Sequence, residues 1–145
     1  MLGILLSMSE DRPGLFISLI GLFFFALLWI LFISLYIYTN IYIKEICRIV
    51  YKDEKKFKRL MEPFDFYYLS MLPSAYWREI LNIKFNVSFK TLYKQNVYLK
   101  TDMPQLRALL KNYPMFFYLH YLVILSGGLG IFLLFLGVGL EKYFF

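Results

Sequence analysis

The hydrophobic pattern of this chain is dominated by two long stretches without charged side chains. Asp, Glu, Lys and Arg are absent from Pro13 to Ile43 and from Asn112 to Leu140, which are runs of 31 and 29 residues. About 20 apolar residues carry a helix across the hydrocarbon core of a bilayer. A single segment in lipid must satisfy its own backbone hydrogen bonds, so both runs are predicted to be transmembrane helices, at residues 14–39 and 114–140.

Tyrosines mark one end of each run. Tyrosine is enriched where a span crosses the interface between membrane and water. Three tyrosines lie around the end of the first span and three around the start of the second, namely Tyr36, Tyr38, Tyr42, Tyr113, Tyr118 and Tyr121. Both interfacial belts are therefore expected to border the connecting region, residues 40–113.

The connecting region begins with a helical pattern. From Ile43 onward, apolar residues recur close to helical spacing, with a polar break at Asp53 and Glu54. The first span is predicted to continue as a helix to about Met61, where Pro63 gives a stop signal.

An aromatic segment, "EPFDFYYLSMLPSAYW", follows from Glu62 to Trp77. Its two prolines and six aromatics make it too interrupted for one long helix and too apolar for a free linker. It is predicted to lie against an apolar surface, either the headgroup layer of the membrane or another protein. Ser74 is expected to cap a helix that starts near Ala75.

The segment from Leu81 to Lys90 is ambiguous between helix and strand. Its apolar and polar residues alternate, as in a strand, but a stripe at helical spacing also runs through it, formed by Trp77, Leu81, Phe85, Phe89 and Leu92. We predict a helix because no second strand is available to pair with it, and the strand remains the alternative.

A clearer helix precedes the second span. Asp102 at the N-cap, Pro104 in the first turn and Gln105 three residues after Asp102 resemble a capping box. This helix is expected to end near Asn112, and Pro114 to start or kink the span.

Composition supports the membrane class. Of the 145 residues, 60% are hydrophobic and 21% aromatic, which is more than a small soluble fold could bury. The predicted fold class is an all-α membrane protein, in which two transmembrane helices form a hairpin joined by a helical region near the membrane surface.

The distribution of charge predicts the orientation. Fourteen of the sixteen basic residues and seven of the ten acidic residues lie between the spans, a net charge of +7 there. By the positive-inside rule, residues 40–113 are cytoplasmic and the tails, residues 1–13 and 141–145, are extracytoplasmic. With no signal-peptide pattern at the start, the first span is expected to be a retained anchor. We predict a multi-pass protein of the bacterial inner membrane.

Seven basic residues follow the first span closely and are predicted to contact anionic lipid. They are Lys44, Arg48, Lys52, Lys55, Lys56, Lys58 and Arg59. Juxtamembrane Lys and Arg are attracted to an anionic leaflet. A nucleic-acid partner would need a recognisable binding fold, which the pattern lacks, so none is expected.

Small residues in the spans indicate close helix packing. The segment "SGGLG" lacks the strand and the lysine of a phosphate-binding loop. Ser126 and Gly130 instead form a small-xxx-small pair, with Gly137 near the same face. We expect this face to pack on the first span through Gly21 and Ser18, with a second protein or a second copy of the chain as the alternative.

Catalytic and metal chemistry find little support in the sequence. His120, the only histidine, is either a satisfied polar anchor, which we favour, or an intramembrane proton site. Cys47 is the only cysteine, and one His with one Cys does not make a metal site. We predict a protein that is not an enzyme, with no cofactor and no evident small-molecule substrate.

The order of parts resembles small bacterial inner-membrane proteins of the universal stress protein B type. The segments "LMEPFDFYYL" and "FKTLYKQNVYLKTDMPQLRALL" and the following span carry the resemblance, over about two thirds of the chain. This chain is longer and has fewer arginines before the second span, with Lys94 and Lys100 there. The resemblance implies a stress-associated membrane protein without catalytic residues to transfer.

Three functions fit these patterns. The first is a non-enzymatic accessory or stabilising subunit that packs against other membrane proteins. The second is a stand-alone envelope stress protein acting at the bilayer. The third is a holin-like or toxin-like membrane perturber, which the large connecting region makes the weakest of the three.

Overall fold

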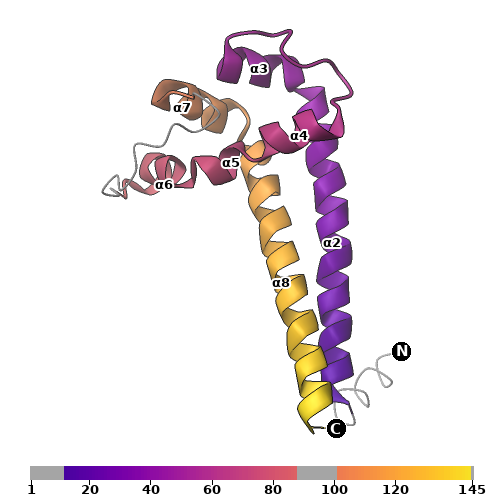
Figure 1. The fold of residues 1–145 in the computed structure, drawn as a ribbon. Helices are drawn as coiled ribbons and strands as arrows, with labels where there is room; N and C mark the ends of the chain where they lie inside the picture. The colour runs from indigo at the N-terminus through magenta and orange to yellow at the C-terminus, as the bar shows by residue number, and fades with distance from the viewer. Residues whose placement is uncertain (1–11, 88–100, 145) are drawn as a thin grey trace. The chain divides into compact units, whose positions relative to one another are not determined.

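The described part of the chain is mainly helical. A computed structural model describes residues 12–87 and 101–144, and contains no strand within those ranges. The helices are α2 (Pro13–Ile41), α3 (Ile43–Tyr51), α4 (Pro63–Ser70), α5 (Leu72–Ala75), α6 (Trp77–Phe85), α7 (Met103–Asn112) and α8 (Pro114–Phe144) (Figure 1). The all-helical prediction is thus confirmed for the described residues.

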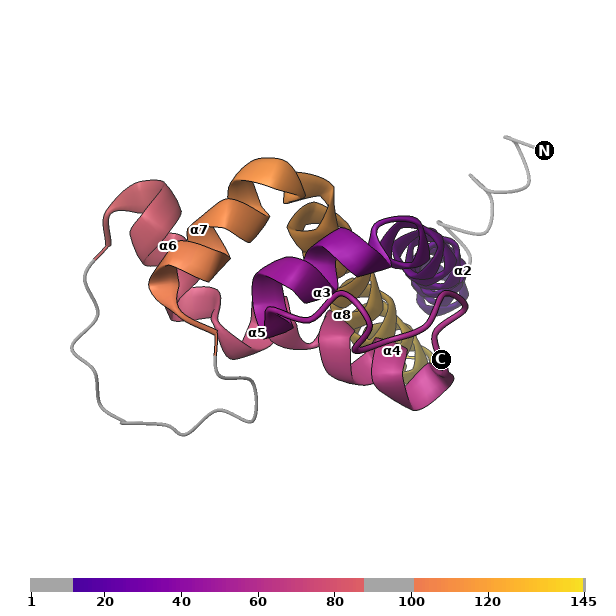
Figure 2. The same ribbon diagram turned by 90° about the horizontal axis from the view of Figure 1, so that it is seen from above.

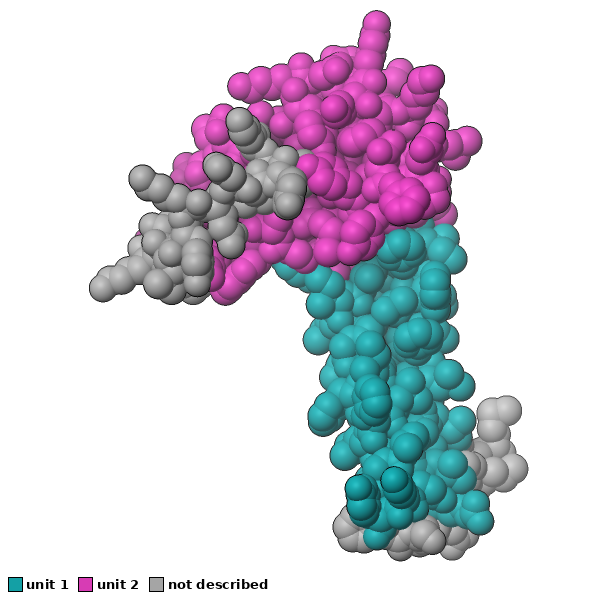
Figure 3. Space-filling model, viewed as in Figure 1, with its two compact units in different colours: residues 1–33, 121–145 teal, residues 34–120 magenta. Residues whose placement is uncertain are grey.

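The chain divides into two compact units, which Figure 3 shows in different colours. Residues 1–33 and 121–145 form the first unit, and residues 34–120 form the second. The helices α2 and α8 each contribute to both units. They are long and apolar enough to cross a membrane.

The first unit is an antiparallel helix pair. Gly14 of α2 faces Gly137 of α8, Gly21 faces Gly130, and further along α2 Leu28 faces Gly127. Because the α8 numbers fall as the α2 numbers rise, the two helices run in opposite directions, as a hairpin requires.

The second unit has its own apolar core. α3 is amphipathic and buries Ile43, Ile46, Cys47 and Val50, while α7 buries Leu106, Leu109 and Leu110. α3 packs against α7, and α6 also contacts α7 (Figures 1 and 2). The α8 end of this unit adds Phe116 and Phe117, both fully buried.

The predicted helix extension to Met61 is wrong. The helix is interrupted at Tyr42, whose φ and ψ are −103° and 16°, and α3 then ends at Tyr51. Lys52 follows in the left-handed region with φ 58°, and Asp53 Oδ1 accepts a hydrogen bond from the Lys55 N–H at 2.9 Å. This turn competes with the helix for backbone donors.

The role predicted for Pro63 is also corrected. Pro63 ends no helix and lies instead in the first turn of α4, where a missing N–H has no cost.

The aromatic segment is interrupted as predicted, since α4 ends at Ser70 and α5 spans only Leu72–Ala75. Its apolar support comes in part from the chain itself, because Phe66, Leu69 and Leu72 are buried in the second unit. The prediction that Ser74 caps a helix is wrong: Ser74 lies inside α5, and Tyr76 occupies the N-cap of α6.

The segment from Leu81 is helical as far as Phe85, where α6 ends, and Asn86 takes the left-handed conformation that closes it. Residues 88–90 lie outside the described residues, as do Phe89 and Leu92 of the predicted stripe. Trp77 and Phe85 are exposed, and Ile80 is the buried residue of this helix.

The start and end of α7 agree with the prediction. Asp102 and Gln105 form the expected capping box, in which Gln105 Oε1 accepts the Asp102 N–H at 2.7 Å. The helix ends at Asn112, and Pro114 begins α8.

Candidate functional site

The closest approach of α2 and α8 lies at Gly21 and Gly130. A Cβ atom on Gly21 would lie 2.9 Å from the Leu134 backbone N and 3.0 Å from the Gly130 carbonyl oxygen. A Cβ on Gly130 would lie 3.1 Å from the Phe25 backbone N. Only hydrogen fits at Gly21 without a backbone shift, so these two predicted packing residues lie together in the structure.

A second contact of this kind involves Gly137, another of the predicted packing residues. A Cβ on Gly137 would approach the Gly14 carbonyl oxygen to 2.6 Å and would clash with Ser18. Ser18 Oγ donates a hydrogen bond to the Gly14 carbonyl oxygen at 2.9 Å. Sequence reasoning missed Gly14, although its spacing of four from Ser18 and seven from Gly21 was a visible signal.

Ser126, the last of the predicted packing residues, is buried on α8. Its hydroxyl donates to the Val123 carbonyl oxygen within α8 at 3.1 Å. The neighbouring Gly127 is the residue whose Cβ would meet the Leu28 side chain, at 2.5 Å. Gly128 and Gly139 have open space around them, so α8 presents small residues on its outer side as well.

His120 is buried in the second unit and hydrogen-bonded to Ser74. Ser74 Oγ and His120 Nε2 lie 2.6 Å apart, and His120 is 5% exposed. The pair ties α5 to the first turns of α8. This geometry fits the polar-anchor interpretation, and Ser74 is a partner that local sequence pattern could not reveal, since 46 positions separate the two residues.

Tyrosines from both predicted belts meet in the second unit. The Tyr42 ring lies 4.9 Å from Tyr38 and 5.3 Å from Tyr113, between centroids. Lys84 Nζ of α6 lies 4.3 Å from the centre of the Tyr118 ring of α8 and donates to the Tyr118 hydroxyl at 3.1 Å. A cation beside an aromatic ring is an arrangement that suits a headgroup layer.

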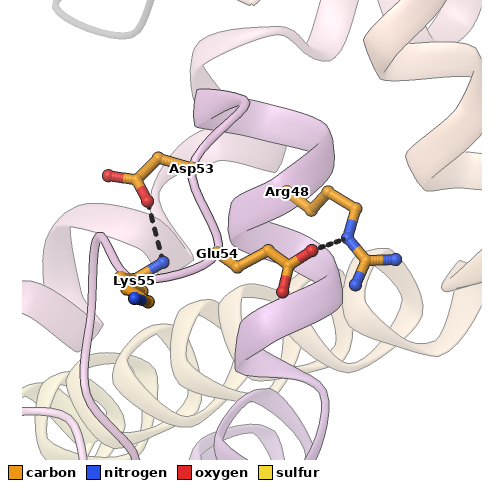
Figure 4. A network of polar contacts seen from close by, with 4 residues as sticks. All are labelled: Arg48, Asp53, Glu54 and Lys55. Carbon is orange, nitrogen blue, oxygen red and sulfur yellow. Dashed lines mark hydrogen bonds and ion pairs between the residues drawn. The ribbon is translucent and has the colours of Figure 1, made fainter.

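The basic residues predicted to contact lipid fall into two groups. Lys44 and Arg48 lie on the exposed face of α3, and Arg48 Nε donates to Glu54 Oε1 at 2.5 Å (Figure 4). The remaining five lie in the loop between α3 and α4 and are all exposed; they are Lys52, Lys55, Lys56, Lys58 and Arg59. The charge of Arg48 is therefore balanced within the chain.

The loop between α3 and α4, residues 52–62, is anchored at both ends. The Phe57 ring stacks edge-on against Tyr51 with centroids 5.6 Å apart. At the far end, the buried Met61 N–H donates to Asn40 Oδ1 at 2.8 Å, and Tyr36 donates its hydroxyl hydrogen to the Met61 carbonyl oxygen at 3.1 Å.

Leu60 and Phe64 flank this anchor and point away from the core. Their side chains are 79% and 85% exposed, while Met61 between them is buried. Leu60 has φ 63°, a left-handed conformation that costs a residue other than glycine about 1–2 kcal/mol. The sequence pattern counted Leu60 in the helical stripe after Ile43 and Phe64 in the aromatic segment expected to lie on an apolar surface, but it did not single out the two as a pair beside the basic run.

Cys47 is fully buried on α3. Burial raises the pKa of its thiol from about 9 to about 11, so the reactive thiolate is scarce near neutral pH. Among the described residues, no group of three His, Cys, Asp or Glu side chains is placed to hold a metal ion.

No family model, curated protein or solved structure matches this chain.

Proposed function

We propose that this protein is a non-enzymatic integral membrane protein of the bacterial inner membrane that acts as an accessory or stabilising subunit of a larger membrane complex. In this proposal α2 and α8 span the bilayer, both termini lie outside, and residues 40–113 lie on the cytoplasmic side near the membrane surface.

The observation that carries the proposal is the outward apolar surface of α2 and α8. Phe23 and Ile30 are 66% and 62% exposed, and Trp29, Phe132 and Phe135 are exposed as well. Water would strongly disfavour such a surface, whereas lipid and other transmembrane helices would accommodate it.

Open small residues favour a protein partner for part of that surface. Gly14, Gly21, Gly130 and Gly137 are used within the hairpin, but Gly128 and Gly139 have open space around them. Small residues allow a neighbouring helix backbone to approach closely, and close packing is a main source of helix association in lipid.

The test is purification of the protein, tagged at its native expression level, in mild detergent, with native-gel sizing and identification of the co-purifying chains. A complex of fixed stoichiometry supports the proposal. Recovery of a lone monomer or homodimer contradicts it and favours a stand-alone envelope stress protein. Growth arrest on moderate overexpression would favour a membrane perturber.

A variant refines the test. Gly128→Leu fills the open side of α8 and should release the partner without disturbing the hairpin. Leu129→Ala, a shortening of the neighbouring exposed side chain, is the matched control and should retain the partner. Equal retention by both variants would place the partner elsewhere.

A further inference from the structure

The loop between α3 and α4 is fixed to the end of α2. Both backbone groups of Met61 are bound to this helix, the N–H by Asn40 Oδ1 at 2.8 Å and the carbonyl oxygen by the Tyr36 hydroxyl at 3.1 Å. Asn40 is itself held, because its Nδ2 donates to the Tyr36 carbonyl oxygen at 2.9 Å. Residues 36–40 are the predicted exit of the first span, so Met61 is held at that level.

The anchor determines what its neighbours can do. Because Met61 faces α2, Leu60 in its left-handed conformation and Phe64 in the first turn of α4 are both directed outward. They are among the most exposed apolar side chains of the second unit. Exposure of these apolar side chains to water is unfavourable in free energy, whereas the boundary between headgroups and acyl chains would bury both.

The charges of the loop complement an anionic surface. Residues 52–59 contain five basic and two acidic side chains, a net charge of +3. Glu54 is paired with Arg48, and Asp53 Oδ1 accepts the Lys55 N–H (Figure 4). Glu62 and Asp65 lie at the N-terminus of α4, where the helix dipole favours negative charge.

Lipid fits this site better than a protein partner does. A stable protein interface covers about 800 Å² on each side, which is far more than two side chains offer. Lysine and arginine beside inserted apolar residues are typical of segments that bind anionic membranes.

We propose that Leu60 and Phe64 insert into the boundary between headgroups and acyl chains of an anionic leaflet, while Lys55, Lys58 and Arg59 contact the lipid phosphates. The inference rests on the proposed function in one respect, that α2 spans the bilayer.

Spin labels measure the depth directly. Leu60→Cys, Phe64→Cys, Glu62→Cys and Ile30→Cys are made singly in the full-length chain and placed in nanodiscs of phosphatidylcholine and phosphatidylglycerol. Cys47 stays in place because it is fully buried, and the unsubstituted chain controls for its labelling. Collision with oxygen, which concentrates in lipid, is compared with collision with a water-soluble nickel chelate.

The labels at positions 60 and 64 should collide more with oxygen and less with nickel than the label at 62, and should be shallower than the label at 30. Labels at 60 and 64 as open to nickel as that at 62 would overturn the inference. So would protection from both reagents, which would show a protein cover, such as a second copy. If the label at position 30 collides freely with the nickel chelate, α2 does not span the bilayer and the proposed function itself is refuted.

A second comparison tests whether the insertion of residues 60 and 64 depends on charge. Replacing phosphatidylglycerol by phosphatidylcholine, or introducing Lys55→Glu, Lys58→Glu and Arg59→Glu together, should shift the labels at 60 and 64 toward water. Lys111→Glu, an exposed charge reversal on α7, should leave the depth unchanged. Depths that do not depend on lipid charge or on the triple variant would overturn the part of the inference that concerns phosphates.

Discussion

Asn40 does more in this molecule than its position at the end of an apolar run suggests. Its side chain accepts the buried Met61 N–H and donates to the Tyr36 carbonyl oxygen. The sequence marks Asn40 as a polar residue near the membrane exit, but nothing in the local pattern indicates a partner 21 residues later. The same holds for Ser74 and His120, which only the folded chain brings together.

Replacing Asn40 should therefore destabilise the second unit. Asn40→Leu leaves the Met61 N–H buried without an acceptor, at a cost of about 1–3 kcal/mol. Thermal unfolding in detergent, followed by circular dichroism, measures the loss. Asn112→Ala, at the exposed end of α7, is the control, and an equal effect of the two variants would contradict the role given to Asn40.

Cys47 gives a prediction about reactivity and pH. Because burial raises the pKa of its thiol to about 11, alkylation by N-ethylmaleimide at pH 8 should be slow in the folded protein and fast after denaturation in SDS. The unfolded thiol loses its proton near pH 9, so stability should fall as the pH rises from about 9 to about 11.

Cys47→Ala removes this titration and is the matched control for the pH series. If the stability curves of the wild type and the variant are parallel between pH 9 and pH 11, folding does not raise the pKa of the thiol.

At the scale of elements, the long helices were predictable and their connection was not. The length of each uncharged run and the capping pattern at Asp102 involve residues close together in the chain, so both can be recognised in the sequence. The end of α3 depends on a competition between helix and turn at Asp53. The apolar residues at 57, 60 and 61 continued the helical spacing, yet Phe57 packs on Tyr51 and Met61 on α2 from within a loop.

The packing of α2 on α8 gives an element-scale prediction. Gly21→Val forces a side chain against the Leu134 and Gly130 backbones, which should cost about 1–3 kcal/mol of hairpin stability. Gly128→Val adds the same atoms where nothing lies within 4 Å and should be nearly neutral. Energy transfer between fluorophores at the two termini, during titration with SDS, reports hairpin opening; coincident curves for the two variants would refute the packing.

At the scale of the whole molecule, the proposed orientation can be tested with exposed positions. A membrane-impermeant maleimide applied to spheroplasts should label Tyr143→Cys, whose side chain is 81% exposed. It should label Lys55→Cys only after permeabilisation, while buried Cys47 stays silent in the unsubstituted control. The reverse pattern would invert the topology.

Fold class and candidate spans follow from composition and charge spacing, whereas the compactness of residues 34–120 does not. That compactness depends on contacts such as Tyr42 with Tyr113 and Tyr76 with Thr101, which join segments far apart in the sequence. An apolar stretch can equally rest on a membrane, on another protein or on its own chain, and the sequence does not distinguish these surfaces.

The burial of Phe116 and Phe117 has a consequence for biosynthesis. These rings complete the core of the second unit, yet the ribosome adds them only after every other helix of that unit. Until then the core of this unit lacks these two rings, and its exposed apolar residues are natural targets for chaperones. A nascent chain that stalls before Pro114 would carry that uncovered core, and cellular proteases could distinguish it from the finished protein.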